Sequence, residues 1–521
     1  MSTHEQPATY AITQLGASEL AGRIARGELT SVAVVEAHIQ RIEQVNPKLN
    51  ALVVKRFVQA RAEARAADEQ LARGEPVGPL HGVPVTIKEC LDVTDLPSTF
   101  GLRSRLAHRA AQDDWAVARL RAAGAIVLGK TNVAQSLIYP ESDNPVYGRS
   151  NNPWDLQRTP GGSSGGEAAI IAVGGSPLGL GTDIGGSVRI PAAFSGIASF
   201  KPTAGRADDS GRFSVPAGQR AVVSQIGPLA RRVEDLALAL RLINGANPQA
   251  VPALADYRSV AISTLRIGYY SFDGTLRSAP AVERAVREAA ALLREAGAEV
   301  VEWTPPAIDE AEHLYYALLT ADAGAGLKRS WRGNPVSPLA SALPTVAGMP
   351  AVLRWLLRKL LARLGQSRAA GMLGHFGFTS ADQYWTLVEQ QLDYQARFAA
   401  ALDQAGLDVI LCPVCPLPAY THGASKDLGT GGGYCIVYNL LGYPAGVLPV
   451  TKVQAGEESN RQVSRDTAEK VAAKVERGSS GLPVAVQVVA RPWREHVSLA
   501  VMATLESSVR ARGESFSPPL A

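Results

Sequence analysis

Apolar residues along the chain recur at helical spacing in some segments and form β-branched runs in others. Residues 17–45 are predicted to form one helix, capped by Ser18 or Thr30. The run VPVTIKE (83–89) is predicted to be a strand that ends at Lys88. Further helices are predicted at 57–73, 233–243, 281–296 and most of 310–400, and further strands at 125–128, 265–270, 407–414, 447–451 and 482–490. This alternation of helices and strands is typical of an α/β fold.

The composition narrows the class of protein. The chain has 521 residues, of which 46% are hydrophobic, and this is enough for a large buried core. A net charge of +4 and an aromatic content of 6%, without interleaved basic and aromatic residues, argue against a nucleic-acid partner. Four cysteines do not make a disulfide framework in so long a chain, so a reducing, cytoplasmic location is expected.

Neither a leader peptide nor a membrane span is expected from the sequence. The N-terminal residues MSTHEQPATY (1–10) lack the charged start, the apolar stretch and the cleavage site of a secretory signal. No apolar run approaches the roughly 18 residues that a spanning helix needs. The eight histidines show no metal-binding spacing, and no metal or other cofactor is expected.

Two motifs resemble known sites but favour other interpretations. GAIVLGKT (124–131) matches a phosphate-binding loop, yet its four central residues are themselves the predicted strand, whereas a phosphate loop turns after its strand. CPVC (412–415), which Cys435 and His422 could complete as a zinc site, is interpreted as buried structural thiols because no second CxxC is present.

The glycine-rich segment GGSSGG (161–166) contains two matches to G-x-S-x-G, the strand-to-helix elbow of α/β-hydrolases. The preceding residues, WDLQRTP, do not resemble a strand, and this argues against an elbow. A histidine-based hydrolase stays open as an alternative, because the sequence offers His313, His375, His422 and His496 downstream.

A lysine can also activate a serine hydroxyl, provided that its amine is neutral. Burial disfavours the charged ammonium, and Lys88 follows an apolar run that should lie inside a sheet. The adjacent Glu89 would favour the charged form, although successive side chains of a strand point to opposite faces. Lys130 and Lys201 are the other lysines close to the serine-rich segments.

A second serine between glycines lies in TDIGGS (182–187). Glycines allow successive N–H groups to turn toward one point, where they stabilise the charge that develops on a carbonyl oxygen. We therefore expect Ser187 to attack a carbonyl group and the oxyanion hole to consist of the N–H groups of Ile184, Gly185, Gly186 and Ser187. With a strand-end lysine and the first serine cluster, these residues predict one acyl-transfer site.

Long segments of the sequence resemble the amidase signature family. The resemblance rests on VPVTIKE and on TPGGSSGGEAAIIAVGGSPLGLGTDIGGSVRIPAAFSGIASFKPT. It continues in family order through GKTNVAQS, NNPWD, YNLLGYPAGVLPVT and GLPVAVQVVARPW, so that it covers most of residues 15–510. Within the family, GGSPLGLGTDIGGS and YPAGVLPVT are most similar to fatty acid amide hydrolases.

The resemblance implies a fold and a division of the chain. The expected α/β fold has a large, twisted, mixed central β-sheet that is covered by helices on both faces. Residues 1–75 are expected to form a helical segment packed on the core. Residues 76–510 are expected to be a single catalytic domain with a mostly helical insertion, or cap, at about 305–400.

The resemblance also implies the role of each site residue. Ser187 would be the nucleophile, Ser163 a bridging serine after a cis peptide bond, and Lys88 the base. A proton would pass from Ser187 through Ser163 to Lys88 and return to the leaving nitrogen, after which water would attack the acyl-enzyme. The residues expected to support this site are Ser164, Asp183 and Arg189.

The substrate is less well defined by the sequence. Leu137 and Ile138 align where fatty acid amide hydrolases line an apolar acyl channel, and Thr182 is also expected to bind substrate. An apolar amide is therefore the expected substrate. A carbamate offers the same attackable carbonyl and is an alternative, as is glutamine if the chain is a glutaminase-type subunit of an amidotransferase complex.

The segment GMPAVLRWLLRKLLARLG (348–365) is an amphipathic helix by its spacing. Its apolar face is predicted to consist of Leu353, Leu357, Leu360 and Leu364. Residues 336–378 contain no acidic residue, so this region accounts for the positive excess of the chain. We interpret it as a mobile cap over the substrate entrance, with peripheral contact to a membrane at most. A docking helix and a homodimer contact are the alternatives.

Overall fold

The computed structural model describes residues 11–207, 218–245, 251–376 and 379–520, so the N-terminal residues assessed for a leader lie outside it. One mixed sheet has eleven strands in the order β1-β3-β2-β6-β8-β7-β12-β13-β11-β9-β10. Its strands are β1 (Leu52–Lys55), β2 (Pro84–Lys88), β3 (Ile126–Thr131), β6 (Leu178–Asp183), β7 (Ala198–Lys201), β8 (Gln225–Ala230), β9 (Arg266–Tyr269), β10 (Glu299–Glu302), β11 (Val409–Pro413), β12 (Ala445–Lys452) and β13 (Pro483–Ala490). A separate two-stranded sheet pairs β4 (Asp143–Asn144) with β5 (Gly148–Arg149).

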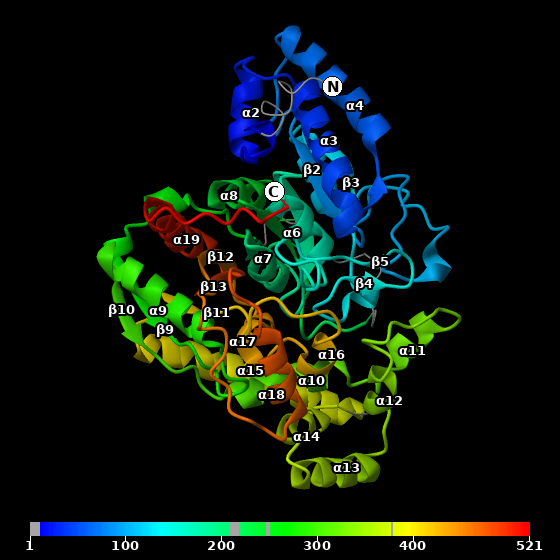
Figure 1. Cartoon of the computed structure of the whole chain (residues 1–521), viewed down its shortest axis with the longest axis vertical. Coiled ribbons are helices and arrows are strands. Elements are labelled where there is room, and N and C mark those ends of the chain that lie inside the picture. The colour runs from blue at the N-terminus through cyan, green and yellow to red at the C-terminus, as the bar shows by residue number, and fades with distance from the viewer. Residues whose placement is uncertain (1–10, 208–217, 246–250, 377–378, 521) are drawn as a thin grey trace.

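Helices cover both faces of the large sheet, as the sequence predicted (Figure 1). They are α2 (Ala17–Ala25), α3 (Ser31–Leu49), α4 (Phe57–Ala72), α5 (Trp115–Ala122), α6 (Gly165–Ala172), α7 (Arg189–Ser195), α8 (Val233–Leu242), α9 (Pro280–Glu295), α10 (Ile308–Leu319), α11 (Ala325–Trp331), α12 (Leu343–Ala347), α13 (Ala351–Arg363), α14 (Ser367–Leu373), α15 (Ala381–Gln404), α16 (Ser425–Leu428), α17 (Gly433–Leu440), α18 (Thr467–Glu476) and α19 (Glu495–Ala511). The predicted strands and the helices at 57–73, 233–243 and 281–296 are confirmed to within a few residues.

The register of β2 brings two distant segments together. β2 pairs in parallel with β6, so that Thr86 faces Gly179 and Ile87 faces Leu180. The carboxyl ends of the two strands therefore lie side by side. Because Lys88 ends β2 and Thr182 lies near the end of β6, their side chains can meet at this edge of the sheet.

The prediction of one helix over residues 17–45 is wrong. The structure has two helices, α2 and α3, separated by a turn in which Gly27 has a φ of 70°. Only glycine adopts this conformation without strain, so the first helix ends there. Thr30 does act as a cap, because its side chain accepts a hydrogen bond from Ala33 N at the start of α3.

The N-terminal segment is less separate than predicted. Between α3 and α4 the chain contributes β1, which pairs with β3 in an antiparallel arrangement and forms one edge of the large sheet. Residues 1–75 are therefore not purely helical in their described part, and they share the sheet with the catalytic core. α2, α3 and α4 lie together at the top of Figure 1.

The predicted helical insertion at 305–400 divides into two parts. α10 and α15 belong to the core, where Tyr315, Tyr394 and Phe398 are buried in one apolar cluster. The intervening helices α11 to α14 (residues 325–373) project from the body of the molecule (Figure 1). We call residues 325–373 the cap.

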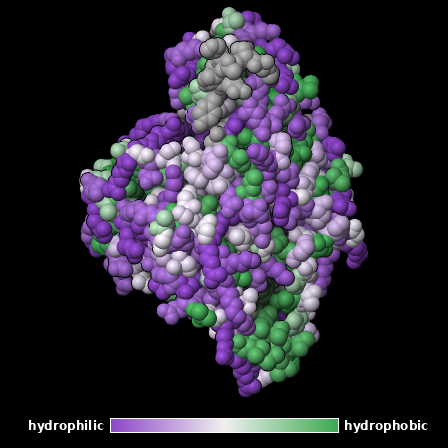
Figure 2. Space-filling model, viewed as in Figure 1, coloured by the Kyte–Doolittle hydropathy of each residue, from purple (hydrophilic) through white to green (hydrophobic). Residues whose placement is uncertain are grey.

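α13 exposes apolar side chains instead of docking on the core. None of its residues, all of which the structure describes, is buried. Leu357 and Leu361 face a cavity under the cap, whereas Leu353 and Leu360 are more than half exposed. Figure 2 shows the resulting hydrophobic patch at the lower end of the molecule. The four predicted leucines therefore do not act as one docking face, and the membrane and homodimer contacts stay predictions.

Among the described helices, none is both long and apolar enough to cross a membrane.

Candidate active site

Lys88 is fully buried and reaches the first serine cluster. Its Nζ lies 2.8 Å from Ser163 Oγ and within hydrogen-bonding distance of Thr182, at 3.2 Å from the carbonyl oxygen and 2.9 Å from Oγ1. Glu89, as the alternation of a strand predicts, points elsewhere: its carboxylate accepts from Thr99 N and Phe100 N. The amine of Lys88 is thus held by two hydroxyls and a carbonyl at the carboxyl ends of β2 and β6.

Contacts distinguish Lys88 from the other two lysines considered. Lys130 donates to Ser98 Oγ and to the carbonyl of Pro97, at a distance from both glycine-rich segments. Burial lowers the pKa of Lys201 to about 7, but its Nζ donates to the carbonyl of Pro202. Lys88 alone of the three contacts a serine of the motif.

The two glycine-rich segments are joined through their backbones. Ser164 N donates to the carbonyl oxygen of Ser187 at 3.1 Å, and the Gly162–Ser163 peptide bond is cis, as the family resemblance implied. Ser142 Oγ supports the first segment, since it accepts from Gly165 N at 2.8 Å. A backbone hydrogen bond therefore joins the segment that carries Ser163 to the segment that carries Ser187.

Asp183 and Arg189 form a fully buried ion pair behind the second segment. Arg189 Nη2 and Nε lie 2.9 Å and 3.0 Å from the two carboxylate oxygens of Asp183. Burial alone would raise the pKa of Asp183, but the guanidinium outweighs it and holds the pKa well below its usual range. The remaining three guanidinium protons go to Asn439 and Gln487, which the sequence did not reveal, and to the carbonyl oxygen of Cys435. The pair anchors the loop that carries Ser187.

One of the four N–H groups predicted for the oxyanion hole already has an acceptor in the structure. Gly186 N donates to Asp183 Oδ1 at 2.8 Å, so this N–H is already used in turning the loop. The N–H groups of Ile184, Gly185 and Ser187 donate to no acceptor in the part of the chain that the structure describes. Gly186 has a φ of 110°, and a Cβ there would lie 2.9 Å from Cys435 Cβ, so both conformation and space require glycine.

Solvent reaches this region at two residues. Within residues 158–203, all of which are described, only Ile184 and Ser187 are partly exposed and the rest are buried. Ser187 is therefore one of the two residues of this stretch that solvent reaches. Beside it, Tyr315 Oη donates to the carbonyl of Ile184 at 3.1 Å.

Comparison with known proteins identifies the family of the chain. The profile of the family described as Amidase matches residues 33–499. The chain is 37% identical to "Fatty-acid amide hydrolase 1" of Sus scrofa over 503 residues, covering 94% of this chain and 84% of that protein. It is also 36% identical to a chain of the "Glutamyl-tRNA(Gln) amidotransferase" of Roseiflexus castenholzii, covering 84% of this chain and 89% of that one.

The chain belongs to the amidase signature family. A solved structure of "Fatty acid amide hydrolase" superimposes with a TM-score of 0.82 at 25% identity, covering 96% of this chain and 86% of that one. The protein is thus a hydrolase of amide carbon–nitrogen bonds other than peptide bonds. Relatives whose names indicate different substrates are similar to this chain at nearly the same identity. Family membership alone therefore does not identify the substrate.

The structure of this amidase bears on the other motifs as well. GKT of the apparent phosphate loop lies in β3, so the loop interpretation is excluded. No strand precedes GGSSGG between residues 150 and 160, and no described histidine hydrogen-bonds to Ser163 or Ser187. Cys412, Cys415 and Cys435 are buried thiols, as interpreted, and the described residues contain no group of three or more potential metal ligands.

All three residues predicted to bind substrate have other surroundings in the amidase. Thr182 is buried and its contacts are with the amine of Lys88, so it positions that amine. Ile138 packs in a small cluster with Trp331 of the cap, and Leu137 packs against the main core. The cavity under the cap is lined instead by the next residue, Tyr139. Ile138 is thus the sequence neighbour of a residue that lines this cavity and does not line it itself.

Glu167 is a buried carboxyl group beside the lysine that the sequence analysis missed. It lies on α6 and accepts from Thr131 Oγ1 at 2.6 Å and from the hydroxyl of Thr86, two residues before Lys88 on the same strand face. Gly179 leaves the space for it, because a Cβ there would collide with Glu167 Oε1. Burial raises the pKa of Glu167 to about 7, against the opposing effects of Thr131, Thr86 and Lys88.

This raised pKa predicts a pH-dependent contribution to stability. The native carboxyl keeps its proton between pH 4.5 and about 7 while the unfolded one loses it, so the free energy of unfolding falls through this window by about 3 kcal/mol. Glu167→Gln removes the titration. Its stability relative to wild type, measured by urea unfolding, should therefore be higher at pH 8 than at pH 5. The exposed Glu302→Gln variant is the control, and an equal difference at both pH values would contradict the prediction.

Proposed function

We propose that this amidase cleaves amides with an apolar acyl group through Ser187, with Ser163 as the proton relay and Lys88 as the base. The observation that carries the proposal is the 2.8 Å contact between the buried Lys88 Nζ and Ser163 Oγ. A neutral amine would donate its two N–H groups to Thr182 and accept from the Ser163 hydroxyl. The lone pair would then be directed at the proton that has to move.

The proposed reaction conserves each proton. Ser187 Oγ attacks the carbonyl carbon as its proton passes to Ser163, whose own proton passes to Lys88. The N–H groups of Ile184, Gly185 and Ser187 would stabilise the oxyanion. When the intermediate collapses, the C–N bond breaks and the leaving nitrogen takes the proton back along the same route. Water then attacks the acyl-enzyme and releases the acid and the free Ser187 hydroxyl.

The apolar acyl group is favoured by the surroundings of the site. The cavity of about 350 Å³ under the cap is lined by Leu343, Val346, Leu357, Leu361, Met372 and Phe376. Such a wall stabilises a hydrocarbon chain by removing it from water. Polar side chains, among them Arg368 and Asp466, also line this cavity, so it is the size of the cavity and its hydrocarbon wall that favour a long apolar acyl group over the small side chain of glutamine.

A panel of substrates tests the proposal. The purified chain is assayed with an octanoyl anilide, acetamide, glutamine and an aryl carbamate, and kcat/KM is compared. The expected order places the octanoyl anilide first. Turnover of glutamine alone would overturn the proposal in favour of the amidotransferase alternative, whereas preference for the aryl carbamate would favour the urethanase alternative at the same Ser187.

A further inference from the structure

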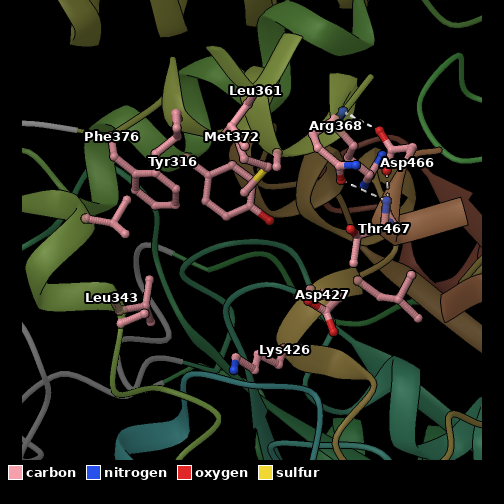
Figure 3. A pocket seen from close by; sticks show the side chains of 18 of the residues that line it. Tyr316, Leu343, Leu361, Arg368, Met372, Phe376, Lys426, Asp427, Asp466 and Thr467 are labelled. Carbon is pink, nitrogen blue, oxygen red and sulfur yellow. Dashed lines mark hydrogen bonds between the residues drawn. The ribbon is translucent and has the colours of Figure 1, made fainter. Parts of the chain in front are cut away.

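The cavity under the cap is amphipathic. Its apolar wall comes from α12, α13 and the end of α14, and its opposite wall comes from α16 and α18. Figure 3 shows Phe376, Tyr316 and Met372 grouped on one side, with Arg368, Asp466 and Thr467 on the other. A ligand that fills this space would meet hydrocarbon along one part of its length and polar groups at another.

One end of the cavity adjoins the proposed catalytic residues. Tyr139 lines the cavity, and a Cβ on Gly162 of the cis peptide bond would lie 2.8 Å from the Tyr139 carbonyl oxygen. Tyr316 also lines the cavity, and its ring lies 5.2 Å from that of Tyr315, the residue that contacts Ile184. The cavity thus adjoins the first glycine-rich segment through Tyr139 and the second through Tyr316 and Tyr315.

Arg368 supplies a positive charge inside this cavity. Its backbone N donates to Asp466 Oδ2 at 3.0 Å, which fixes the start of α14, and its side chain is only partly exposed. The guanidinium forms no ion pair within 4.0 Å and no hydrogen bond with the residues that the structure describes. A half-buried guanidinium without a carboxylate partner is a ready site for an anionic group.

Several carboxyl groups lie near Arg368, but none within the described residues forms an ion pair with its guanidinium within 4.0 Å. Asp427 and Asp466 line the same cavity. Burial raises the pKa of Glu312 to about 7 and also raises the pKa of Asp273, in both cases against the opposing charge of Arg368. Residues 336–378, which include most of the cap, contain no acidic side chain. An anionic group that enters the cavity can therefore pair with Arg368 without displacing a carboxylate from its guanidinium.

We propose that Arg368 determines specificity for acyl chains that end in a carboxylate, so that the substrates include amides of long dicarboxylic acids. The apolar wall would bind the methylene chain, and the guanidinium would pair with the terminal carboxylate. This inference rests on the proposed function, because it concerns the group at the far end of the acyl chain of the same substrate.

A matched pair of substrates tests the inference. Octanoyl 4-nitroanilide and the mono-4-nitroanilide of octanedioic acid have acyl chains of equal length, which end in a methyl group and a carboxylate. The wild type should give a higher kcat/KM for the carboxylate substrate. Arg368→Gln keeps the backbone hydrogen bond to Asp466 and should lower the ratio of the two kcat/KM values by about 10- to 100-fold, mainly through KM. Arg368→Lys should restore part of it.

The control is Arg363→Gln, which removes an exposed charge from α13 outside the cavity wall and should leave the ratio unchanged. An unchanged ratio in Arg368→Gln, or an equal loss with both substrates, would overturn the inference while the proposed function stands. Failure of the wild type to hydrolyse either anilide would instead count against the proposed function.

Discussion

Replacing Ser187 with alanine is expected to lower kcat for amide hydrolysis by at least about 10⁴-fold. The hydroxyl is the proposed attacking group, and loss of the nucleophile in a serine hydrolase removes nearly all of the catalysis that its triad provides. The fold should persist, because Ser187 is held through its backbone: its carbonyl accepts from Ser164 N. Steady-state kinetics with an anilide substrate provide the measurement.

The control for this variant is Ser507→Ala, an exposed serine on α19 that should keep wild-type kinetics. Thermal melting of both variants would show whether the loss of rate is a loss of structure. If Ser187→Ala hydrolysed the substrate at a rate within tenfold of wild type, the assignment of the nucleophile would be wrong.

Replacing Lys88 with methionine should have an effect of similar size. Methionine retains much of the length and volume of the side chain in a fully buried position but cannot accept a proton from Ser163. Because the triad acts as a unit, the Lys88→Met and Ser187→Ala double variant should be no slower than Ser187→Ala alone. Additive losses would indicate that the two residues act independently.

The histidines provide the contrast for Lys88. His422 Nε2 lies 3.3 Å from the carbonyl of Leu156, and His496 lies at the start of α19, so neither is placed to act on Ser187. His422→Ala and His496→Ala should therefore retain activity within a few-fold of wild type. A loss of several orders of magnitude in either one, with Lys88→Met active, would favour a histidine-based hydrolase.

The chemical groups of the site can be predicted from the sequence because each of them lies in a short, recognisable segment of the chain. Lys88 ends a buried strand, and both serines are flanked by glycines, so a pattern of a few residues defines each part. The contact of Lys88 with Thr182 follows once β2 and β6 are neighbours in the sheet, whereas Ser163 lies outside the sheet, before α6. The order of the sheet itself is not readable from residue patterns.

The features that the sequence does not reveal depend on long-range packing. Glu167 follows a glycine-rich motif in the sequence, but its role depends on two threonines from other segments and on the space left by Gly179. Likewise, the spacing predicts that the N–H of Gly186 joins the oxyanion hole, but in the folded chain it donates to Asp183. Neither contact has a signature in the spacing of residues.

The cap is a further example of a feature that the spacing of residues does not define. The helical spacing of leucines in α13 shows only that the leucines share a face and not what covers that face. In the structure, Leu357 faces the cavity and Leu360 faces solvent. Similarly, the sequence shows Arg368 only as one basic residue of this region, and the folded chain places it in the cavity wall, where its guanidinium forms no ion pair with the described residues.

Peptide mapping of the covalent intermediate tests the central assignment most directly. The protein is treated with a fluorophosphonate, which forms a stable analogue of the acyl-enzyme, and the modified peptide is sequenced by mass spectrometry. Activation of Ser187 by Lys88 through Ser163 predicts one adduct per chain, on Ser187, that forms far more slowly in Lys88→Met. An adduct on any other residue, or an equal rate of labelling in Lys88→Met, would contradict it.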